Sequence, residues 1–320
     1  MTDSVMTQVS HSPIESVLAG ELARGDVVLG AIGPMLGMLL ANHDNALFSD
    51  EVVARVRAMV RHVAQQALVA QAHAAGIEEP YGFADDRCGP LAEALAEDLA
   101  FVGHCHALAL EYRLAMQIER RNGIDPVVSP LLQSLIASSD SRTARLAMAL
   151  LAAQARFVQQ QRRMELPLGE LPRALFERVL TAWRGLAADS SPNAIEQADK
   201  RMRDAYDEQV GRLSLLVRAT GAVGDAMKPA LSVGHAGVAL FLTALSLATG
   251  MERGLAAVST NESQLGRLAL SLRSAGLAAD GIAEQFVLIH PEVTLPVALD
   301  ALRGDRARSI LADSGRQALD

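Results

Sequence analysis

The chain has 320 residues, of which half are hydrophobic and 3% aromatic, and it carries a net charge of −8. Its length allows one large domain or two ordinary ones with a sizeable core. The acidic balance and the lack of a Lys/Arg block argue against a surface that follows nucleic-acid phosphates. The apolar residues are mainly Ala, Leu and Val, which is typical of packed helices rather than of a sandwich or barrel.

Start and stop signals predict helices along the whole chain. The segment Ser12–Glu15 combines a capping Ser, a Pro at the first helical position and a Glu three residues after the cap. Gly76, Gly123 and Gly250 follow apolar-periodic runs, as glycines at helix C-termini do. In chain order, helices are expected at 13–24, 28–42, 50–75, 90–122, 127–138, 141–165, 172–188, 192–219, 229–249, 261–275 and 280–290, followed by two short ones.

This pattern predicts an all-α fold, a multi-helix bundle of roughly a dozen helices. No segment shows the strict alternation of apolar and polar residues, bounded by turn signals, that a half-buried strand shows. The segment from Gly76 to Gly89 is expected to be the longest linker. It carries Tyr81, Phe83 and four acidic residues, so we expect it to fold over the surface.

An internal repeat is suggested by two similar stretches. Pro34–Ala41 resembles Pro130–Ala137, 96 residues later, and each stretch leads into a long helix with a related Arg- and Gln-containing end. The alternative explanation is chance similarity between Leu/Ala-rich helices. We expect two or three diverged helical-hairpin repeats, with a duplication over 28–75 and 125–165 and a fainter third copy that begins at Leu242.

The expected domain organisation is a single continuous helical body with short tails. Residues 1–11 are polar and lack the apolar core of a signal peptide, and two cysteines do not make a disulfide framework, so a cytoplasmic location is expected. The predicted regions are a disordered N-terminal tail at 1–11, a helical region at 12–165, a second helical region at 166–315 packed on the first, and a C-terminal tail at 316–320.

The segment Leu231–Met251 is about long and apolar enough to span a bilayer. It contains three glycines and His235, and Lys228 and Arg253 flank it on its two sides, so no charge asymmetry sets an orientation. These features favour a buried central helix over a membrane span.

Two polar helix ends form the candidate ligand site. Arg and Gln side chains both donate hydrogen bonds to carboxylate or phosphate groups. If the fold brings the ends of the helices at 50–75 and 141–165 together, they can form a pocket for an anionic group. The alternative is solvated helix surface or polar contact between helices. The candidate ligand-binding residues are Arg61, Gln65, Gln66, Arg156, Gln160 and Gln161.

Other residues with reactive or metal-binding side chains do not form a convincing constellation. His104 and His106 flank Cys105, but they lie about 200° apart around a helix and cannot hold one ion together. His104 shares a helical stripe with Glu97 and Glu111, which we interpret as a polar stripe facing solvent or a neighbouring helix. No nucleotide-binding or Ser-nucleophile motif occurs. We therefore assign no catalytic residue, no metal ligand and no cofactor.

The sequence leaves three functions open. The first is a non-enzymatic helical scaffold or regulatory protein that binds a protein partner or self-associates through long amphipathic helices. The alternative is an enzyme or binding protein for a small apolar or anionic ligand held in a cavity of the bundle. A contiguous exposed apolar patch would favour the first function, and a closed pocket with Arg61 or Arg156 at its mouth would favour the second. A third option is a membrane-associated protein that uses Leu231–Met251.

Overall fold

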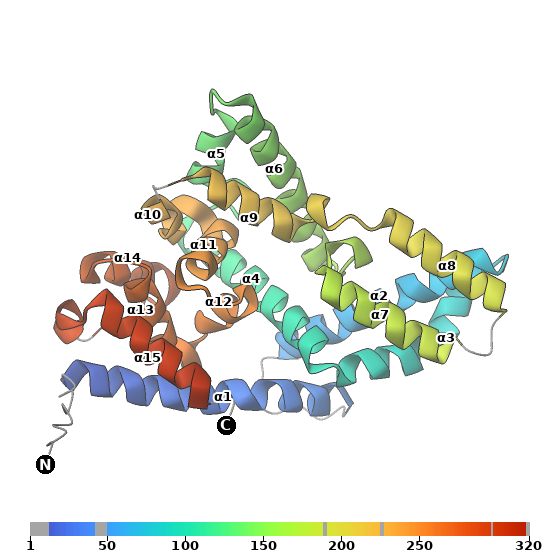
Figure 1. Cartoon of the computed structure of the whole chain (residues 1–320), viewed down its shortest axis with the longest axis horizontal. Helices are drawn as coiled ribbons and strands as arrows, with labels where there is room; N and C mark the ends of the chain where they lie inside the picture. The colour runs from blue at the N-terminus through green and yellow to red at the C-terminus, as the bar shows by residue number, and fades with distance from the viewer. Residues whose placement is uncertain (1–12, 42–49, 188–190, 225–226, 296, 318–320) are drawn as a thin grey trace, which may run out of the picture.

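The computed structural model describes residues 13–41, 50–187, 191–224, 227–295 and 297–317, and every regular element within these ranges is a helix (Figure 1). The predicted all-α, multi-helix bundle is confirmed. Helix pairs lie at both places where a duplication is expected, although their lengths differ. The pairs are α1 (Pro13–Ala41) with α2 (Asp50–Ala74), and α5 (Pro130–Ile136) with α6 (Ser141–Arg162). The origin of these pairs by duplication stays a prediction.

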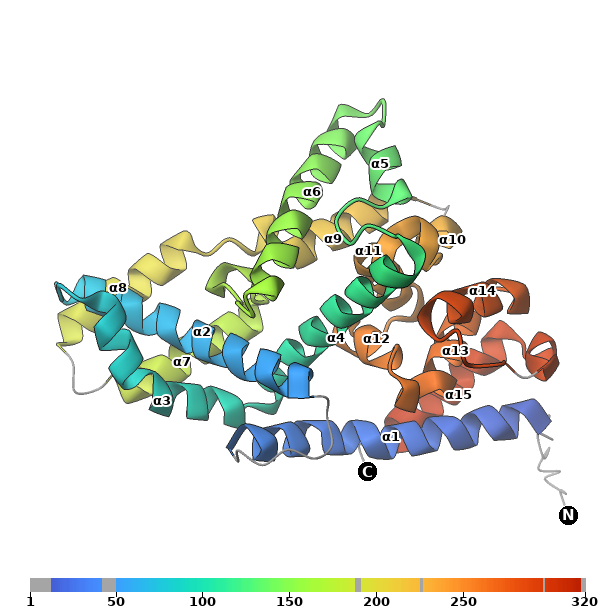
Figure 2. The same ribbon diagram turned by 180° about the vertical axis from the view of Figure 1, so that it is seen from behind.

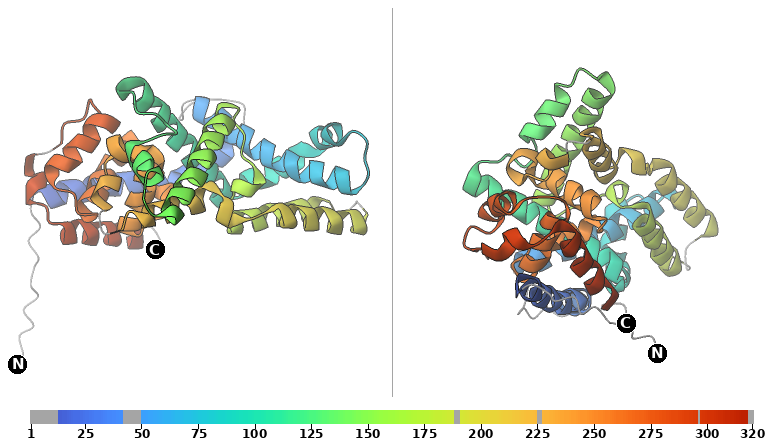
Figure 3. Two further views of the ribbon diagram at one scale, coloured as in Figure 1. Left: turned by 90° about the horizontal axis from the view of Figure 1, so that it is seen from above. Right: turned by 60° about the vertical axis from the view of Figure 1, so that its left-hand side comes forward.

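One end of the elongated molecule, which we call the α2 lobe, is built around α2 (Figures 1 and 3). Its hydrophobic core includes Val56, Met59 and Trp183, all with no exposed surface. Trp183 donates a 2.7 Å hydrogen bond from Nε1 to Oε1 of Gln71, so the one polar atom of this side chain is satisfied. The helices of this lobe are α2, α3 (Pro80–Glu97), the first half of α4 (Leu99–Asn122), α7 (Arg173–Leu186) and α8 (Pro192–Ala205).

The other end, which we call the α11 lobe, contains the C-terminal helices and a second hydrophobic core. It also includes the hairpin of α5 and α6, which projects from one side of the molecule (Figure 1). Its helices are α9 (Arg212–Ala222), α10 (Met227–Ala230), α11 (Val233–Thr249), α12 (Arg253–Ser259), α13 (Leu265–Ser274), α14 (Ala279–Ile289) and α15 (Gly304–Gln317). Short 3₁₀ turns are η1 (Leu168–Glu170), η2 (Glu208–Val210), η3 (Glu262–Gln264) and η4 (Val297–Ala301).

Helices α4 and α1 connect the two lobes. α4 buries Phe101 and Cys105 in the core of the α2 lobe and Leu114 and Ile118 in the core of the α11 lobe. α1 lies along one long side of the molecule (Figure 2) and packs its first half on α13 and α15. Each core therefore draws on residues from both sides of position 165, so the regions predicted at 12–165 and 166–315 share their hydrophobic interior.

The predicted linker at Gly76–Gly89 is wrong, because α3 begins inside it at Pro80. Proline is well tolerated in the first turn of a helix, where its missing N–H would have no partner, and Pro80 takes this place instead of Pro90. The predicted helix at 90–122 is also interrupted, at Asp98. The carboxylate of Asp98 accepts hydrogen bonds from the backbone N–H groups of Ala100 and Phe101 and caps α4.

Four further boundaries differ from the sequence-based expectation. The helices predicted at 13–24 and 28–42 form the single helix α1, and the one predicted at 192–219 is divided into α8 and α9. α12 was not expected from its short Arg253–Ser259 sequence. α15 continues to Gln317, two residues into the predicted tail at 316–320. The predicted tail at 1–11 and residues 318–320 lie outside the described residues.

The apolar segment Leu231–Met251 lies in the core, as expected for a central buried helix. Within it, α11 breaks at Gly237, whose φ of 71° and ψ of 164° are outside the helical region. In the part of the chain that the structure describes, no single helix is both long and apolar enough to cross a membrane. α11 and α12 satisfy this test only as a pair, and they are bent by 113° relative to each other.

Candidate functional site

A buried ion network lies where the two lobes meet. Glu111 of α4 is 1% exposed, and its two carboxylate oxygens accept hydrogen bonds from both Nη atoms of Arg212 at 2.8 and 3.0 Å. Both Nη atoms of Arg253 donate to the same oxygens at 2.8 and 2.9 Å. Bidentate, charge-assisted hydrogen bonds of this kind are the strong ones in proteins. The carboxylate is therefore fully engaged, and the three side chains together carry one more positive than negative charge.

Neighbouring side chains hold the two guanidinium groups in place. Arg212 also donates to Oε1 of Gln154 at 3.1 Å, and its Cζ atom lies 3.6 Å from the centroid of the Phe157 ring. Arg253 donates from Nε to Oγ1 of Thr243 at 2.9 Å and from Nη2 to the carbonyl oxygen of Ala239. The network thus joins α4, α6, α9, α11 and α12, and its arrangement is that of a structural junction.

The network shifts the titration of two groups on α4. Burial would by itself raise the pKa of Glu111, but Arg212 and Arg253 outweigh it and hold this pKa well below its usual range. Burial, followed by repulsion from the same two arginines, lowers the pKa of His104 to about 4. Nε2 of His104 is buried and has no hydrogen-bond partner among the described residues. At neutral pH the site therefore contains an ionised Glu111 and a neutral His104.

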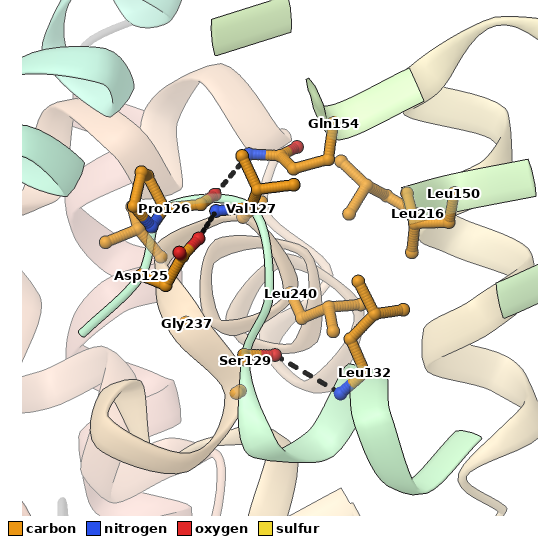
Figure 4. A pocket seen from close by; sticks show the side chains of 13 residues that line it. Asp125, Pro126, Val127, Ser129, Leu132, Leu150, Gln154, Leu216, Gly237 and Leu240 are labelled. Atoms are coloured by element: carbon orange, nitrogen blue, oxygen red, sulfur yellow. Dashed lines mark hydrogen bonds between the residues drawn. The ribbon is translucent and has the colours of Figure 1, made fainter. Parts of the chain in front are cut away.

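A small pocket lies beside this network, at the break in α11 (Figure 4). Its wall includes Gln154, whose Nε2 donates to the carbonyl oxygen of Pro126, and Ser129, whose Oγ accepts from the N–H of Leu132. Its volume of about 20 Å³ is enough for roughly one water molecule. The pocket is therefore too small for an organic ligand.

A larger groove runs between α1 and the helices α2, α4 and α12. We call it the α1 groove. It has a volume of about 430 Å³ and is lined by Val27, Val28, Ala31, Ile32, Met35, Val52, His106, Leu110, Arg113, Val258, Asn261 and Ser263. The floor is made of side chains that are less than a tenth exposed, including Val52, His106 and Leu110. At the rim, Val27 is 75% exposed and Val28 is 41% exposed. The groove is therefore a deep apolar depression that opens to solvent.

Two basic side chains of α4 line the α1 groove. Arg113 is half-buried and makes no hydrogen bond or ion pair with any residue that the structure describes. Burial, followed by repulsion from Arg113, lowers the pKa of His106 to about 4, so this imidazole is neutral at pH 7. Among the described residues that line the groove, one side chain is therefore charged, and it is a cation.

A second depression, the α8 groove, has a similar volume of about 440 Å³. It is lined by Gln66, Ala70, His73, Leu168, Gly169, Phe176, Arg201, Met202, Ala205 and Tyr206. Four of these residues, His73, Gly169, Arg201 and Ala205, are exposed. It is therefore shallower than the α1 groove and less able to exclude water from a ligand.

Arg61 and Gln65, which the sequence suggests as ligand-binding residues, point toward α3. Gln65 donates a 2.9 Å hydrogen bond to Oδ1 of Asp85, and the guanidinium of Arg61 lies 3.9 Å from the same oxygen. Both Arg61 and Asp85 are more than half exposed. These two candidates therefore contribute to a surface contact between α2 and α3.

The other candidates lie near the end of α6, and the structure does bring this end to α2. Gln66 donates to the carbonyl oxygen of Leu166 and accepts from the N–H of Leu168, while the buried Gln161 donates to the carbonyl oxygen of Glu165. The backbone carbonyl of Gln161 also accepts from Arg55 of α2. Of the six candidates, Gln66 lines a groove, the α8 groove. Arg156 is exposed and Gln160 half-buried, and neither lines one of the grooves described above. Their role in binding a ligand stays a prediction.

Among the described residues, no group of three or more His, Cys, Asp or Glu side chains could hold a metal ion. Cys88 and Cys105 are free and buried, and burial raises the pKa of both thiols. Their thiol groups are therefore protonated at neutral pH and poor nucleophiles.

The sequence does not reveal the partners of Glu111 in the ion network or the role of Arg113 in the α1 groove. The sequence places Glu111 on a polar stripe facing solvent or a neighbouring helix, and the structure agrees with the second alternative, because Glu111 faces Arg212 of α9 and Arg253 of α12. Arg212 lies 101 residues and Arg253 142 residues further along the chain, and no local pattern marks them as its partners. Arg113 was not singled out, because the apolar walls around it come from α1, α2 and α12.

The fold and the grooves define an all-α protein with a buried ion network between two lobes and one deep, apolar, cationic groove. Comparison of the chain with family models, with curated proteins and with solved structures finds no match.

Proposed function

We propose that the protein binds a small amphipathic ligand, with an apolar body and an anionic group, in the α1 groove. The observation that carries this proposal is the half-buried Arg113, which has no partner among the described residues and lies beside an apolar depression of about 430 Å³. Removing a charge from water is costly unless an opposite charge or hydrogen bonds compensate. An anionic group on a bound ligand would supply that compensation, while the apolar walls would bind the rest of the ligand.

The size of the α1 groove favours a small ligand over a protein partner. Ligand sites typically have volumes of about 300–1,000 Å³, whereas a stable protein interface buries about 800 Å² on each partner. Large exposed apolar residues outside this groove are spread over different helices, and single residues of this kind are normal on a soluble surface. Examples are Tyr81 on α3, Met148 on α6, Leu186 on α7, Val217 on α9 and Val287 on α14. The protein-binding scaffold expected from the sequence stays a prediction.

A cytoplasmic location is part of this proposal. Its support is the pair of free thiols, Cys88 and Cys105, since thiols persist in reducing compartments.

The proposal is tested by titrating the protein with 8-anilinonaphthalene-1-sulfonate, an apolar fluorophore with one negative charge. Val28→Glu places a carboxylate at the rim of the groove, where it repels the anionic probe. Val17→Glu is the matched control, because Val17 is a 53% exposed valine on the same helix that does not line the groove. Circular dichroism during heating checks that both variants fold.

Saturable binding of one probe per chain is expected for the original protein and for Val17→Glu, with at least tenfold weaker binding for Val28→Glu. Equal binding by all three proteins, or no saturable binding, would overturn the proposal. Native mass spectrometry of the same samples reports the oligomeric state and any ligand retained through purification. A dimer whose interface excludes the probe would support the scaffold hypothesis instead.

A further inference from the structure

Building on the proposed function, we infer that the ligand of the α1 groove is an aliphatic carboxylate, such as a medium-chain fatty acid, whose carboxylate pairs with Arg113. Three features of the groove lead to this chemical class: its charge, the nature of its walls and its shape.

The charge of the groove matches one negative charge. Of the lining residues that the structure describes, Arg113 is the one cation, since burial keeps the neighbouring His106 neutral at pH 7. Asn261 and Ser263 contribute uncharged polar groups. A carboxylate is a planar monoanion whose two oxygens fit the fork of a guanidinium. A phosphate monoester carries about −1.5 to −2 charges at pH 7 and would leave negative charge uncompensated against an apolar wall.

The apolar walls of the groove are aliphatic. They consist of Val, Ile, Leu, Met and Ala side chains, and none of the described lining residues is aromatic. Aromatic ligands gain from stacking on aromatic side chains, whereas a flexible hydrocarbon chain packs equally well on aliphatic ones. Met35 adds a flexible side chain that can adapt to a chain of variable shape. The α8 groove differs in this respect, because it contains Phe176 and Tyr206 stacked with centroids 4.0 Å apart.

The lining residues of α4 and α1 extend over two or more helical turns, and on α4 the charge lies at one end. On α4, the lining residues His106, Leu110 and Arg113 share one face, with Arg113 at the C-terminal end of a stretch of about 10 Å. On α1, the lining residues run from Val27 to Met35, a stretch of about 12 Å. A lining stretch of this length on α4, with its cation at one end, fits a ligand with a terminal anionic group and a linear body.

The inference is tested by isothermal titration of the whole protein with four compounds that each carry a ten-carbon chain: decanoate, decan-1-ol, decyl phosphate and decyltrimethylammonium. These share the hydrocarbon chain and differ in the head group. Arg113→Gln removes the cation, and Arg113→Lys keeps the charge but removes the fork. Arg218→Gln is the matched control, because Arg218 is exposed on α9, lies outside the groove and has no partner among the described residues.

Decanoate is expected to bind at least tenfold more tightly than decanol and decyltrimethylammonium, and more tightly than decyl phosphate. Arg113→Gln should weaken decanoate at least tenfold and leave decanol unchanged. Arg113→Lys should weaken decanoate by a smaller factor, and Arg218→Gln should have no effect. Decanol binding reports on the apolar walls alone, so a variant that no longer binds decanol has lost the groove itself. If Arg113→Gln behaves in this way, the decanoate affinity of Arg113→Lys is compared with that of the original protein instead.

Tighter binding of decyl phosphate than of decanoate would overturn the inference, and so would decanoate binding that does not depend on Arg113. If the fluorescent sulfonate binds at the α1 groove but none of the compounds with a ten-carbon chain does, the inference fails while the proposed function stands. If the sulfonate does not bind either, the proposed function itself fails.

Discussion

Glu111 and Arg212 form a buried bidentate ion pair across 101 positions of the chain, with N–O distances of 2.8 and 3.0 Å and side chains that are 1% and 2% exposed. Arg253 forms a second bidentate pair with the same carboxylate. Removing charges from water is expensive, so such a network is stable only while every member keeps its partners. The network therefore fixes the relative positions of α4, α9 and α12 more than it adds to net stability.

Replacing Glu111 by Gln is expected to lower the free energy of unfolding by about 3–5 kcal/mol, because the buried guanidinium of Arg212 and the largely buried one of Arg253 lose their compensating charge. Urea unfolding followed by circular dichroism measures the change. Glu93→Gln on α3 is the control, since Glu93 is exposed, and it should change stability by less than about 0.5 kcal/mol. A loss below 1 kcal/mol for Glu111→Gln would show that the network is not held in the folded protein as described.

The positions of the helices were largely predictable from local signals, whereas the contacts between them were not. Pro13 and Glu15 mark the start of α1, and Gly123 marks the end of α4, because such signals depend on residues close in sequence. α3 was missed because Pro80 and Pro90 are both acceptable first-turn residues by local criteria, and packing against α2 decides between them. Long-range packing has no such short-range signature.

The candidate site shows the same limit. The six Arg and Gln residues chosen from the sequence are polar helix ends, and two of them, Gln66 and Gln161, do lie where α2 meets the chain after α6. Their donors are occupied by backbone carbonyls of that connecting segment. Arg113 has an ordinary sequence context, and it stands out only when its burial and its lack of a partner within the described part of the chain are known.

Gly266→Ala is expected to destabilise the contact between α13 and α1. A Cβ atom at Gly266 would lie 2.8 Å from Cβ of Glu21 and 3.4 Å from the backbone nitrogen of Leu22, so one helix would have to shift. Overpacking of this kind costs about 1–3 kcal/mol, measurable as a lower midpoint in urea unfolding. Gly20→Ala on α1 is the opposite case, since nothing lies within 4 Å of its Cβ position. Because alanine favours helix, Gly20→Ala should stabilise the protein by about 0.5–1 kcal/mol. Equal effects of the two substitutions would contradict the close approach of these helices.

Gly237→Ala is expected to disturb the break in α11. The φ of 71° and ψ of 164° at this position lie in a region that is essentially restricted to glycine, and a Cβ atom there would lie 3.0 Å from Cβ of Ser129. The strain should lower the free energy of unfolding by about 1–3 kcal/mol. Gly221→Ala on α9 is the control, because its Cβ would meet nothing within 4 Å and its φ is not positive. A Gly237→Ala variant as stable as the original protein would mean that α11 can continue as a regular helix through this position.

The buried histidine of the α1 groove predicts how stability depends on pH. The pKa of His106 is about 4 in the folded protein and about 6.5 in the unfolded chain, so the unfolded chain takes up the proton first as the pH falls. The stability that neutral His106 contributes is therefore complete above about pH 6.5 and is lost as the pH falls from there toward about 4. Between pH 7.5 and pH 5 this loss amounts to about 2 kcal/mol, and it should be absent in His106→Gln.

The measurement is the free energy of urea unfolding at both pH values for the original protein, for His106→Gln and for His73→Gln. His73→Gln is the control, because His73 is an exposed histidine on α2. The difference between pH 7.5 and 5 should shrink in His106→Gln and persist in His73→Gln. The comparison uses the change in stability with pH within each protein, so a general loss of stability in His106→Gln does not affect it. An unchanged pH dependence of the unfolding free energy in His106→Gln would show that His106 can be protonated in the folded state.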